Sequence, residues 1–579
     1  MADVKTILRF ALVVPLLLAS ASCSGKKDEP ATVPTGAADA VSVPAAPASV
    51  PSASASADPA ALATTAIAAM SDSDLAGQVL MPYAYGSEAT IVDKSSAAGN
   101  QGLAGVDTPA QMVAKFHLGG LILVSFAPQD PTGSTNPATN VENPQQVRRL
   151  TDGLQAAAKQ LPGGAPLMIG TDQEYGVVTR VTDGVTMLPS AMGVGAAGQS
   201  PLTEDAWRAA GEELAAMGIT VDFAPVADTL GPPANTVIGS RSFGGDPAAN
   251  GGQVAAAVRG LRAGGVAAGV KHFPGHGHTS GDSHAGLPVI TQTAAQLAAQ
   301  DLPPFRAGVA AGAGVVMSGH LDVQAVDKGV PATFSHKIMT DLLRGSLKFT
   351  GVAISDAMNM PPAMTWPAGD AAVRALNAGN DMLLMPPDIA AARDGILAGL
   401  KSGSLKRERL VEAVTRILTL KFRTAQNRQP DLGTVNSVAH QQSVAALDAA
   451  SITLLQGPCT GPLVSGPVTV TAADGRETAR VTLVKALQAA GVTVQAAGGK
   501  VIHLVGYGDQ SIDLDPAAAV TVGMDTPYLL AAAKSPVLVA TYSSSQLSLA
   551  ALASVIAGKT KAPGRSPVAV AGLPRTACP

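Results

Sequence analysis

The sequence predicts an α/β protein: a (β/α)8 barrel of the TIM type, followed by a smaller open α/β sandwich domain. Three observations support this. Eight short apolar runs alternate with helical stretches between residues 77 and 386, a polar tract then interrupts the pattern, and strands and helices alternate again to the chain end. Apolar residues make up 46% of the 579 residues and charged residues only 14%, a composition that supports buried cores rather than wholesale disorder.

The first 22 residues are typical of a secretory signal peptide. Lys5 and Arg9 precede the apolar run ALVVPLLLA, and small residues lead to Cys23. This run is too short to anchor stably across a bilayer. A Cys after Ala-Ser resembles a bacterial lipoprotein cleavage site, although Ser20 stands where Leu is more common. The alternatives are therefore lipidation of Cys23, which we expect, and an ordinary signal with an incidental Cys.

Residues 23–60 are rich in Pro, Ala and Ser and show neither a helical nor a strand period. This composition predicts a disordered tether. With a lipid on Cys23, the chain would be exported and held on the outer face of the bacterial cytoplasmic membrane or in the cell envelope.

The barrel prediction covers residues 61–428. Near-continuous apolar strands that alternate with helices indicate a parallel sheet covered on both faces, and eight such units fit a barrel. The apolar runs are 77–84, 119–125, 166–174, 218–228, 265–273, 312–321, 350–360 and 379–386. Between them, one helix is predicted from an N-cap at Thr203 to a stop at Gly218, and another begins at Asp246-Pro247.

Polar residues follow several of these strands in the same sense. They are Asp172, Glu174, Asp228, Lys271, His272, His320 and Asp356. A single Asp after a strand is usually a cap or turn residue. Because active sites of such barrels lie at the carboxyl ends of the strands, the repetition predicts one cleft on which these residues converge.

The segment 271–284, KHFPGHGHTSGDSH, has the densest group of titratable residues. His276, His278 and His284 could bind a metal, but no ligand-spaced partners accompany them. The segment also lacks the glycine-lysine pattern of a phosphate loop. Some of these histidines could simply hold the loop in shape, and for His276 and His278 this is as plausible as a direct role.

A third interpretation is acid–base chemistry. In extended chain, residues two apart project to the same side, so Asp282 could accept a hydrogen bond from His284 and stabilise its imidazolium form. Such a pair donates a proton and takes one back. Asp356 could attack an anomeric carbon from across the cleft, while Lys271 and His272 donate hydrogen bonds to the substrate.

Together with IGTDQEYGVVTR, RSFGGDP and ISDAMNM, this segment resembles glycoside hydrolase family 3 in its β-N-acetylglucosaminidase branch, over roughly residues 70–425. The resemblance implies a retaining enzyme with Asp356 as nucleophile, His284 as acid/base and Asp282 as its partner. It implies no metal and no organic cofactor. The positions implied to hold terminal N-acetylglucosamine are Asp172, Arg180, Arg241, Lys271 and His272.

The chain departs from the family pattern at Tyr175, where Gly is common, and at Val177, where Arg is common. We therefore expect the rim of the cleft near Tyr175 to differ from that of the family, and the family's leaving-group preference is not carried over to this chain. The Pro-rich segment after Asp356 is expected to shape the leaving-group side.

Residues 429–579 form the predicted second domain, in which no catalytic residue stands out. Cys459 and Cys578 are its only cysteines. In an oxidising compartment they are expected to pair, the alternative being two free thiols.

The sequence therefore predicts an exo-acting hydrolase that releases β-linked N-acetylglucosamine, with cell-wall peptidoglycan fragments as the substrate source. The alternatives are a broader β-glycosidase, a phosphorolytic variant, and a lipoprotein that binds cell-wall sugar without cleaving it. The net charge of −4 and the lack of a basic stripe argue against nucleic acid. We expect the chain to act as a monomer.

Overall fold

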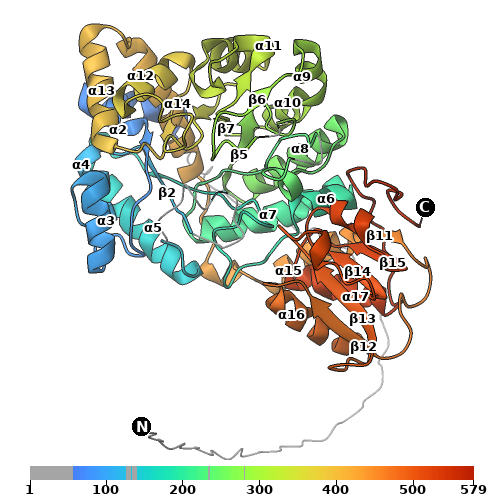
Figure 1. The fold of residues 1–579 in the computed structure, drawn as a ribbon. Helices are drawn as coiled ribbons and strands as arrows, with labels where there is room; N and C mark the ends of the chain where they lie inside the picture. The colour runs from blue at the N-terminus through green and yellow to red at the C-terminus, as the bar shows by residue number, and fades with distance from the viewer. Residues whose placement is uncertain (1–56, 126–131, 133–139, 232–234, 280, 579) are drawn as a thin grey trace, which may run out of the picture. The chain divides into compact units, whose positions relative to one another are not determined.

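The computed structural model describes residues 57–125, 132, 140–231, 235–279 and 281–578 (Figure 1). The predicted signal peptide, Cys23 and nearly all of the predicted tether lie outside these residues. Within the described ranges, no helix combines the length and apolar character needed to cross a membrane.

Eight parallel strands form the barrel, and each falls inside one of the eight predicted apolar runs. They are β1 (Leu80–Met81), β2 (Gly120–Ile122), β3 (Met168–Thr171), β4 (Val221–Asp222), β5 (Ala267–Phe273), β7 (Val315–Ser318), β9 (Val352–Ile354) and β10 (Leu383–Leu384). Six of them make one sheet in the order β2-β3-β4-β5-β7-β9, and β1 pairs with β10. A bridge between Ile354 and Met382 joins β9 to β10, and the Ile122 N–H donates to the Pro82 carbonyl, so the ring closes. The barrel prediction is confirmed.

Helices precede, connect and follow the strands of this ring. They are α1 (Pro59–Ala68), α2 (Asp72–Gln78), α3 (Lys94–Ala104), α4 (Pro109–Phe116), α5 (Pro144–Ala158), α6 (Ala191–Ala197), α7 (Ser200–Ala216), α8 (Pro247–Ala263), α9 (Ala294–Gln300), α10 (Leu302–Ala310), α11 (Gln324–Asp327), α12 (Ala368–Ala378), α13 (Ile389–Ser402) and α14 (Arg407–Ala425). A π-helix, η4, spans Lys337–Ser346. Two short strands outside the ring, β6 (Val289–Ile290) and β8 (Asp322–Val323), pair with each other.

Two predicted helix starts have different outcomes. The Asp246 side chain accepts hydrogen bonds from the N–H groups of Ala248 and Ala249, as expected of an N-cap. The Thr203 prediction is wrong, because α7 already begins at Ser200, and Pro201 suits its first turn. Thr203 is buried inside the helix, where its hydroxyl bonds the Gln253 side chain at 2.6 Å.

Large apolar side chains fill the barrel interior. A Cβ on Gly170 of β3 would lie 2.6 Å from the Met81 side chain and 2.8 Å from the Phe223 ring, so any larger residue would have to displace these side chains. The interior is thus a packed core that leaves room for polar groups only at the strand ends.

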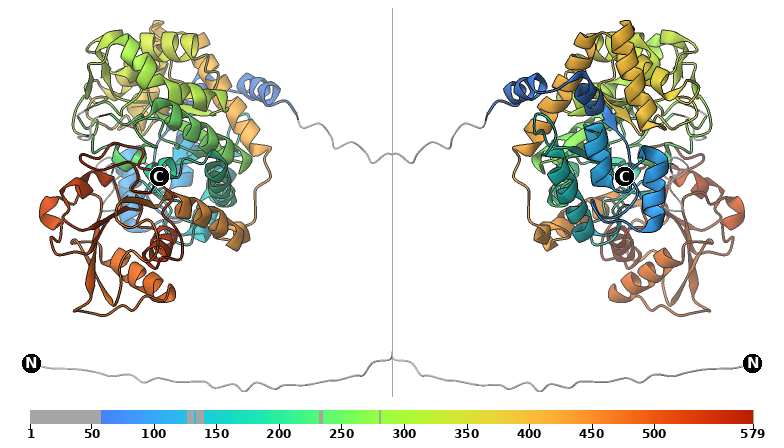
Figure 2. Two further views of the ribbon diagram at one scale, coloured as in Figure 1. Left: turned by 90° about the vertical axis from the view of Figure 1, so that its right-hand side faces the viewer. Right: turned by 90° about the vertical axis from the view of Figure 1, so that its left-hand side faces the viewer.

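The C-terminal domain has its own five-stranded sheet and helices, drawn in orange and red in Figures 1 and 2. Its strands, in the order β11-β15-β14-β13-β12, are parallel except for β11. The strands are β11 (Thr453–Gln456), β12 (Val468–Ala472), β13 (Lys500–Val505), β14 (Val520–Gly523) and β15 (Val537–Ala540), and the helices are α15 (Val438–Ser451), α16 (Glu477–Ala489) and α17 (Gln546–Ile556). The expected Cys459–Cys578 disulfide is present.

The predicted domain boundary at 428/429 falls between α14 and α15. Val444 and Leu447 of α15 belong to the barrel's apolar core, and α15 packs on α6 and α7. The first helix after the boundary is therefore shared between the two domains, and the boundary itself stays a prediction.

Candidate active site

A cavity opens at the carboxyl ends of the barrel strands. Its charged and polar lining includes seven residues predicted from the sequence, namely Asp172, Arg180, Arg241, Lys271, His272, His284 and Asp356. The eighth, Asp282, lies behind His284, to which it is hydrogen-bonded.

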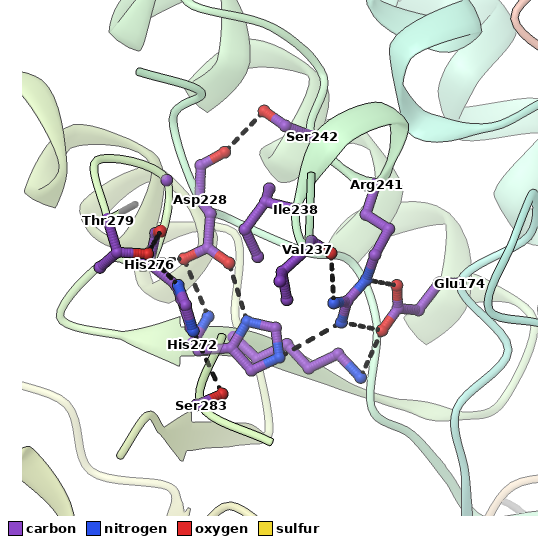
Figure 3. Close-up of polar contacts among 12 residues, drawn as sticks. Glu174, Asp228, Val237, Ile238, Arg241, Ser242, His272, His276, Thr279 and Ser283 are labelled. Atoms are coloured by element: carbon purple, nitrogen blue, oxygen red, sulfur yellow. Dashed lines mark hydrogen bonds and ion pairs between the residues drawn. The ribbon is translucent and has the colours of Figure 1, made fainter. Parts of the chain in front are cut away.

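Glu174 lies buried behind one wall of this cavity, next to Arg241 (Figure 3). Its carboxylate oxygens accept hydrogen bonds from Arg241 Nε at 2.7 Å and Nη2 at 2.9 Å, and Lys271 Nζ lies 2.6 Å from Oε1. Burial alone would raise the pKa of the Glu174 carboxyl, but the charges of Arg241 and Lys271 outweigh it and lower the pKa. Glu174 is therefore ionised and fixes two cations. The sequence placed it at a strand end without giving it a role.

Lys271 connects this wall to Asp172. Its Nζ lies 2.7 Å from Asp172 Oδ1, and the Arg180 guanidinium lies 3.6 Å from Oδ2. Burial opposes the lysine charge, yet Asp172 and Glu174 raise the pKa of Lys271. The Asp172 side chain is 14% exposed, so its carboxylate is held by cations and still faces the cavity as a hydrogen-bond acceptor.

Asp228 anchors the loop that follows β5. Its carboxylate accepts hydrogen bonds from His272 Nδ1 at 2.8 Å, from the His272 N–H at 3.1 Å and from the His276 N–H at 2.7 Å (Figure 3). Asp228 is fully buried. It does not face the cleft, which corrects the expectation that all strand-end groups would converge there.

His320 corrects the same expectation. It is fully buried, with Nε2 3.0 Å from the Ala357 carbonyl oxygen and Nδ1 2.9 Å from the Thr333 hydroxyl. Ala357 adjoins Asp356, so His320 supports the backbone beside that residue rather than lining the cavity. Its inward position could not be read from its place after a strand.

His276 and His278 both hold the loop after β5 in shape. This is one of the two roles that the sequence left open for them, the other being a direct role in the chemistry. His276 bonds the Thr279 and Ser283 hydroxyls, at 2.8 and 3.2 Å, and also lines the cavity. Burial, together with the charge of His272, lowers the pKa of His276 to about 4. His278 Nδ1 lies 2.8 Å from Asp301 Oδ1. In the part of the chain that the structure describes, no three His, Cys, Asp or Glu side chains form a group suited to a metal ion.

The expected Asp282–His284 hydrogen bond is present, with 2.8 Å between His284 Nδ1 and Asp282 Oδ1. The chain there is not extended, however. The same carboxylate oxygen accepts the His284 N–H at 2.8 Å, and the Ala285 N–H closes a turn onto the Asp282 carbonyl. Burial would raise the pKa of Asp282, but these bonds from His284 lower it. The carboxylate thus holds Nδ1 and leaves Nε2 as the nitrogen that can act on a ligand.

Asp356 follows β9 at the same end of the barrel. Its Oδ1 accepts the Ala357 N–H at 2.8 Å. Burial would raise the pKa of its carboxyl, but the charges of His272, His320 and His284 and this hydrogen bond lower it. Asp356 is therefore ionised at neutral pH and lies within electrostatic reach of His284 in the same cavity.

Tyr175 does not form the rim that we expected. It is 2% exposed and packs edge-to-face on Trp207, with 5.7 Å between ring centroids. The segment after Asp356 does reach the cavity, through Ala357 and Met360. Four further apolar residues line the cavity: Val237, Met317, Leu384 and Met385. The sequence did not predict them, because aliphatic residues are just as common in any buried core.

Barrel and cavity together are those of the glycoside hydrolase class, with an ionised Asp, a His–Asp pair and a charged wall at the carboxyl ends of the strands. Residues 92–420 match the model described as "Glycosyl hydrolase family 3 N terminal domain". The chain belongs to glycosyl hydrolase family 3, and the resemblance seen in its motifs is confirmed.

Named relatives point the same way. The chain is 33% identical over 61% of its length to "Beta-hexosaminidase A" of Pseudoalteromonas piscicida, of which it spans 62%, and 33% identical over 54% of its length to "Beta-hexosaminidase LpqI" of Mycobacterium tuberculosis, of which it spans 77%. A solved family 3 β-N-acetylglucosaminidase from Paenibacillus sp. str. FPU-7 shares 30% identity and a TM-score of 0.74, covering 87% of this chain and 99% of that one. This likeness extends over both domains.

Proposed function

We propose that the protein is a retaining exo-β-N-acetylglucosaminidase that hydrolyses terminal, non-reducing β-linked N-acetylglucosamine. The observation that carries the proposal is the presence of Asp356 and of the Asp282-bound His284 in one cavity at the barrel mouth. The relatives named beta-hexosaminidase and the solved β-N-acetylglucosaminidase support the sugar assignment.

The reaction we propose has two steps. In the first, an Asp356 carboxylate oxygen attacks the anomeric carbon, the glycosidic bond breaks, and the proton on His284 Nε2 goes to the leaving oxygen. In the second, water attacks the anomeric carbon, its proton passes to His284, and the bond to Asp356 breaks. Asp282 keeps Nδ1 occupied throughout, so that Nε2 serves as acid and then as base.

The charged wall binds the sugar in this proposal. Asp172 accepts hydrogen bonds from hydroxyl groups, while Arg180, Arg241, Lys271 and His272 donate to hydroxyl or acetamido oxygens. Ion pairs with Asp172 and Glu174 already hold the Lys271 and Arg241 side chains in position, so these donors need little reorganisation when the sugar binds.

Peptidoglycan fragments are the proposed substrate source, and lipid-anchored export through Cys23 is the proposed location. Both rest on the signal-like first 22 residues and the Ala/Pro/Ser-rich segment that follows. A phosphorolytic reaction stays the alternative within the same site, because an imidazole acid/base repels an incoming phosphate less than a carboxylate would.

A panel of aryl β-glycosides and muropeptide fragments tests the proposal, with products identified by mass in the presence and absence of phosphate and of a chelator. We expect free N-acetylglucosamine as the product and equal rates with chelator. Sugar 1-phosphate would establish phosphorolysis, a metal-restorable loss would establish a metal site, and an inert protein would favour sugar binding without cleavage.

A further inference from the structure

We propose that Asp525, in the C-terminal domain, is a positioning residue for the sugar site in the barrel. It acts through Ser240 on Arg241, and the inference rests on the function proposed above. It assigns the C-terminal domain a part in substrate binding although that domain lends no residue to the described lining of the cavity.

Arg241 is presented by a single 3-10 turn, η2 (Gly239–Arg241). Ser240, at its centre, is buried and donates a hydrogen bond from Oγ to Asp525 Oδ1. Asp525 follows β14 in the C-terminal sheet. The hydrogen bond therefore joins the residue before Arg241 to a strand end of the other domain.

Two further contacts brace the same loop from the same domain. Ile238, the residue before the turn, belongs to an apolar cluster shared with Leu530 and Tyr542 of the C-terminal domain (Figure 3 shows Ile238 beside Val237). On the other side of Arg241, the Gly245 N–H donates to the Pro567 carbonyl at 3.2 Å. The loop that carries Arg241 is thus held at three points by residues beyond position 520.

The position of Arg241 matters because most of its guanidinium N–H groups already have protein partners. It binds Glu174 through Nε and Nη2, donates from Nη1 to the Val237 carbonyl at 3.0 Å, and brings Nη2 within 3.4 Å of His272 Nε2 (Figure 3). A shift of the turn would move this guanidinium relative to both the carboxylate and the imidazole, and with it the donors that face the sugar.

The turn also has room to shift. A second cavity, of about 590 Å³, lies between the barrel and the C-terminal domain and is lined by Ser240 and Asp525 themselves, with Gly176, Arg476 and Ser545 among others. The Asp525 carboxylate holds Ser240 at the edge of this second cavity. Its removal should therefore loosen η2 rather than let other side chains close over it.

Kinetics on an aryl β-N-acetylglucosaminide test the proposal with the full chain. We expect Asp525→Ala and Ser240→Ala each to raise KM about 10-fold with a smaller change in kcat, as for a lost binding interaction. Asp525→Asn keeps an acceptor oxygen and should stay within about 3-fold of wild type. The double variant should be no worse than either single variant, because one contact is removed in each case.

Asp509→Ala is the matched control. Asp509 forms an ion pair with Arg476 in the same domain, at 2.9 Å, and this pair does not involve Ser240, so its loss should disturb the domain and leave KM unchanged. Equal KM rises in Asp509→Ala and Asp525→Ala, or additive losses in the double variant, would overturn the proposal. If Asp525→Ala fails to fold, Ser240→Ala decides.

A failure of the proposed function is recognised separately, since the wild type would then be inert on the aryl substrate. In that case a crystal structure of Ser240→Ala decides the inference. Displacement of Arg241 from Glu174 supports it, and an unmoved Arg241, with Nη2 still 2.9 Å from Glu174 Oε1, refutes it.

Discussion

The two sides of the proposed active-site cavity, one assigned above to sugar binding and the other to catalysis, are built differently. On the binding side, the Glu174, Arg241 and Lys271 side chains are 2–3% exposed and are held by ion pairs between residues 67 or more positions apart in the chain. On the catalytic side, Asp282 and His284 are two residues apart, share one turn, and have side chains 36% and 11% exposed. The binding wall thus depends on the whole fold, whereas the acid/base pair is set by a local turn.

This difference predicts two kinds of loss on substitution. Removing a member of the buried wall leaves a charge uncompensated in the interior and should reduce stability as well as binding. Removing a catalytic group should reduce the rate and leave the stability nearly unchanged. Substitutions on both sides of the cavity sharpen or break this comparison.

Asp356→Asn should have the largest effect on rate. Without an ionised carboxylate to attack the anomeric carbon, turnover should fall on the order of 10⁴-fold, while the urea unfolding midpoint stays near that of wild type. Asp341→Asn, which changes an exposed Asp outside the cavity, is the control and should be silent. Turnover of Asp356→Asn close to wild type would remove this residue as the nucleophile.

Glu174→Gln should have the largest effect on stability. The amide cannot balance the buried charges of Arg241 and Lys271, and loss of one partner in such a group costs about 3–5 kcal/mol. Glu88→Gln is the control, because Glu88 pairs with Arg149 at the surface and should be worth less than about 1 kcal/mol. Equal unfolding free energies for the two variants would show that the wall does not depend on Glu174.

His284→Ala should divide substrates by their leaving groups. General acid catalysis is worth roughly 10²–10⁴-fold, but activated aryl leaving groups need little protonation, so the loss should be much larger on muropeptide fragments. Asp282→Ala should follow the same trend more weakly, since it holds His284 without touching the substrate. Equal losses on both substrates would point to a different acid.

The sequence predicted best what depends on local order. The strands follow from the apolar runs, and the cavity residues Asp172, Lys271, His272 and Asp356 follow from their places at or just after the strand ends. The Asp282–His284 hydrogen bond follows from the two-residue spacing, although a turn forms it and not extended chain. The strand rule could not tell Asp172, which faces the cavity, from Asp228, which is fully buried, because both come after strands. That distinction depends on partners about 45 residues or more away, such as His272 for Asp228 and Lys271 for Asp172.

Tyr175 is a second residue whose side-chain direction could not be predicted from its place in the sequence. A departure from the family pattern inside a binding motif predicted a changed rim, but the side chain turns inward onto Trp207 of α7. The role of Ser240 is also invisible in sequence, because its partner Asp525 lies 285 residues further on. Contacts between domains at such distances are fixed by tertiary packing and leave no local signal.

The smallest expected effect concerns His440, at the start of α15, where the shared helix meets the barrel. Its Nδ1 lies 2.9 Å from Glu213 Oε1 and its Nε2 3.0 Å from Glu212 Oε2. The hydrogen bond with Glu213 is the main cause that raises the pKa of His440, with the one to Glu212 adding to it against burial. A raised pKa in the folded state means that the protonated imidazole stabilises the fold.

This stabilisation should be fully present below the ordinary histidine pKa of about 6.5 and be lost as pH rises through the raised value. We therefore expect wild type to exceed His440→Gln in unfolding free energy by more at pH 6 than at pH 9, as measured by urea titration. His336→Gln, which changes an exposed histidine 3.8 Å from Asp341, should show no such pH-dependent gap. A gap for His440→Gln that is equal at both pH values would show that His440 acts here as a neutral packing residue, and that the contact between the domains does not depend on its charge.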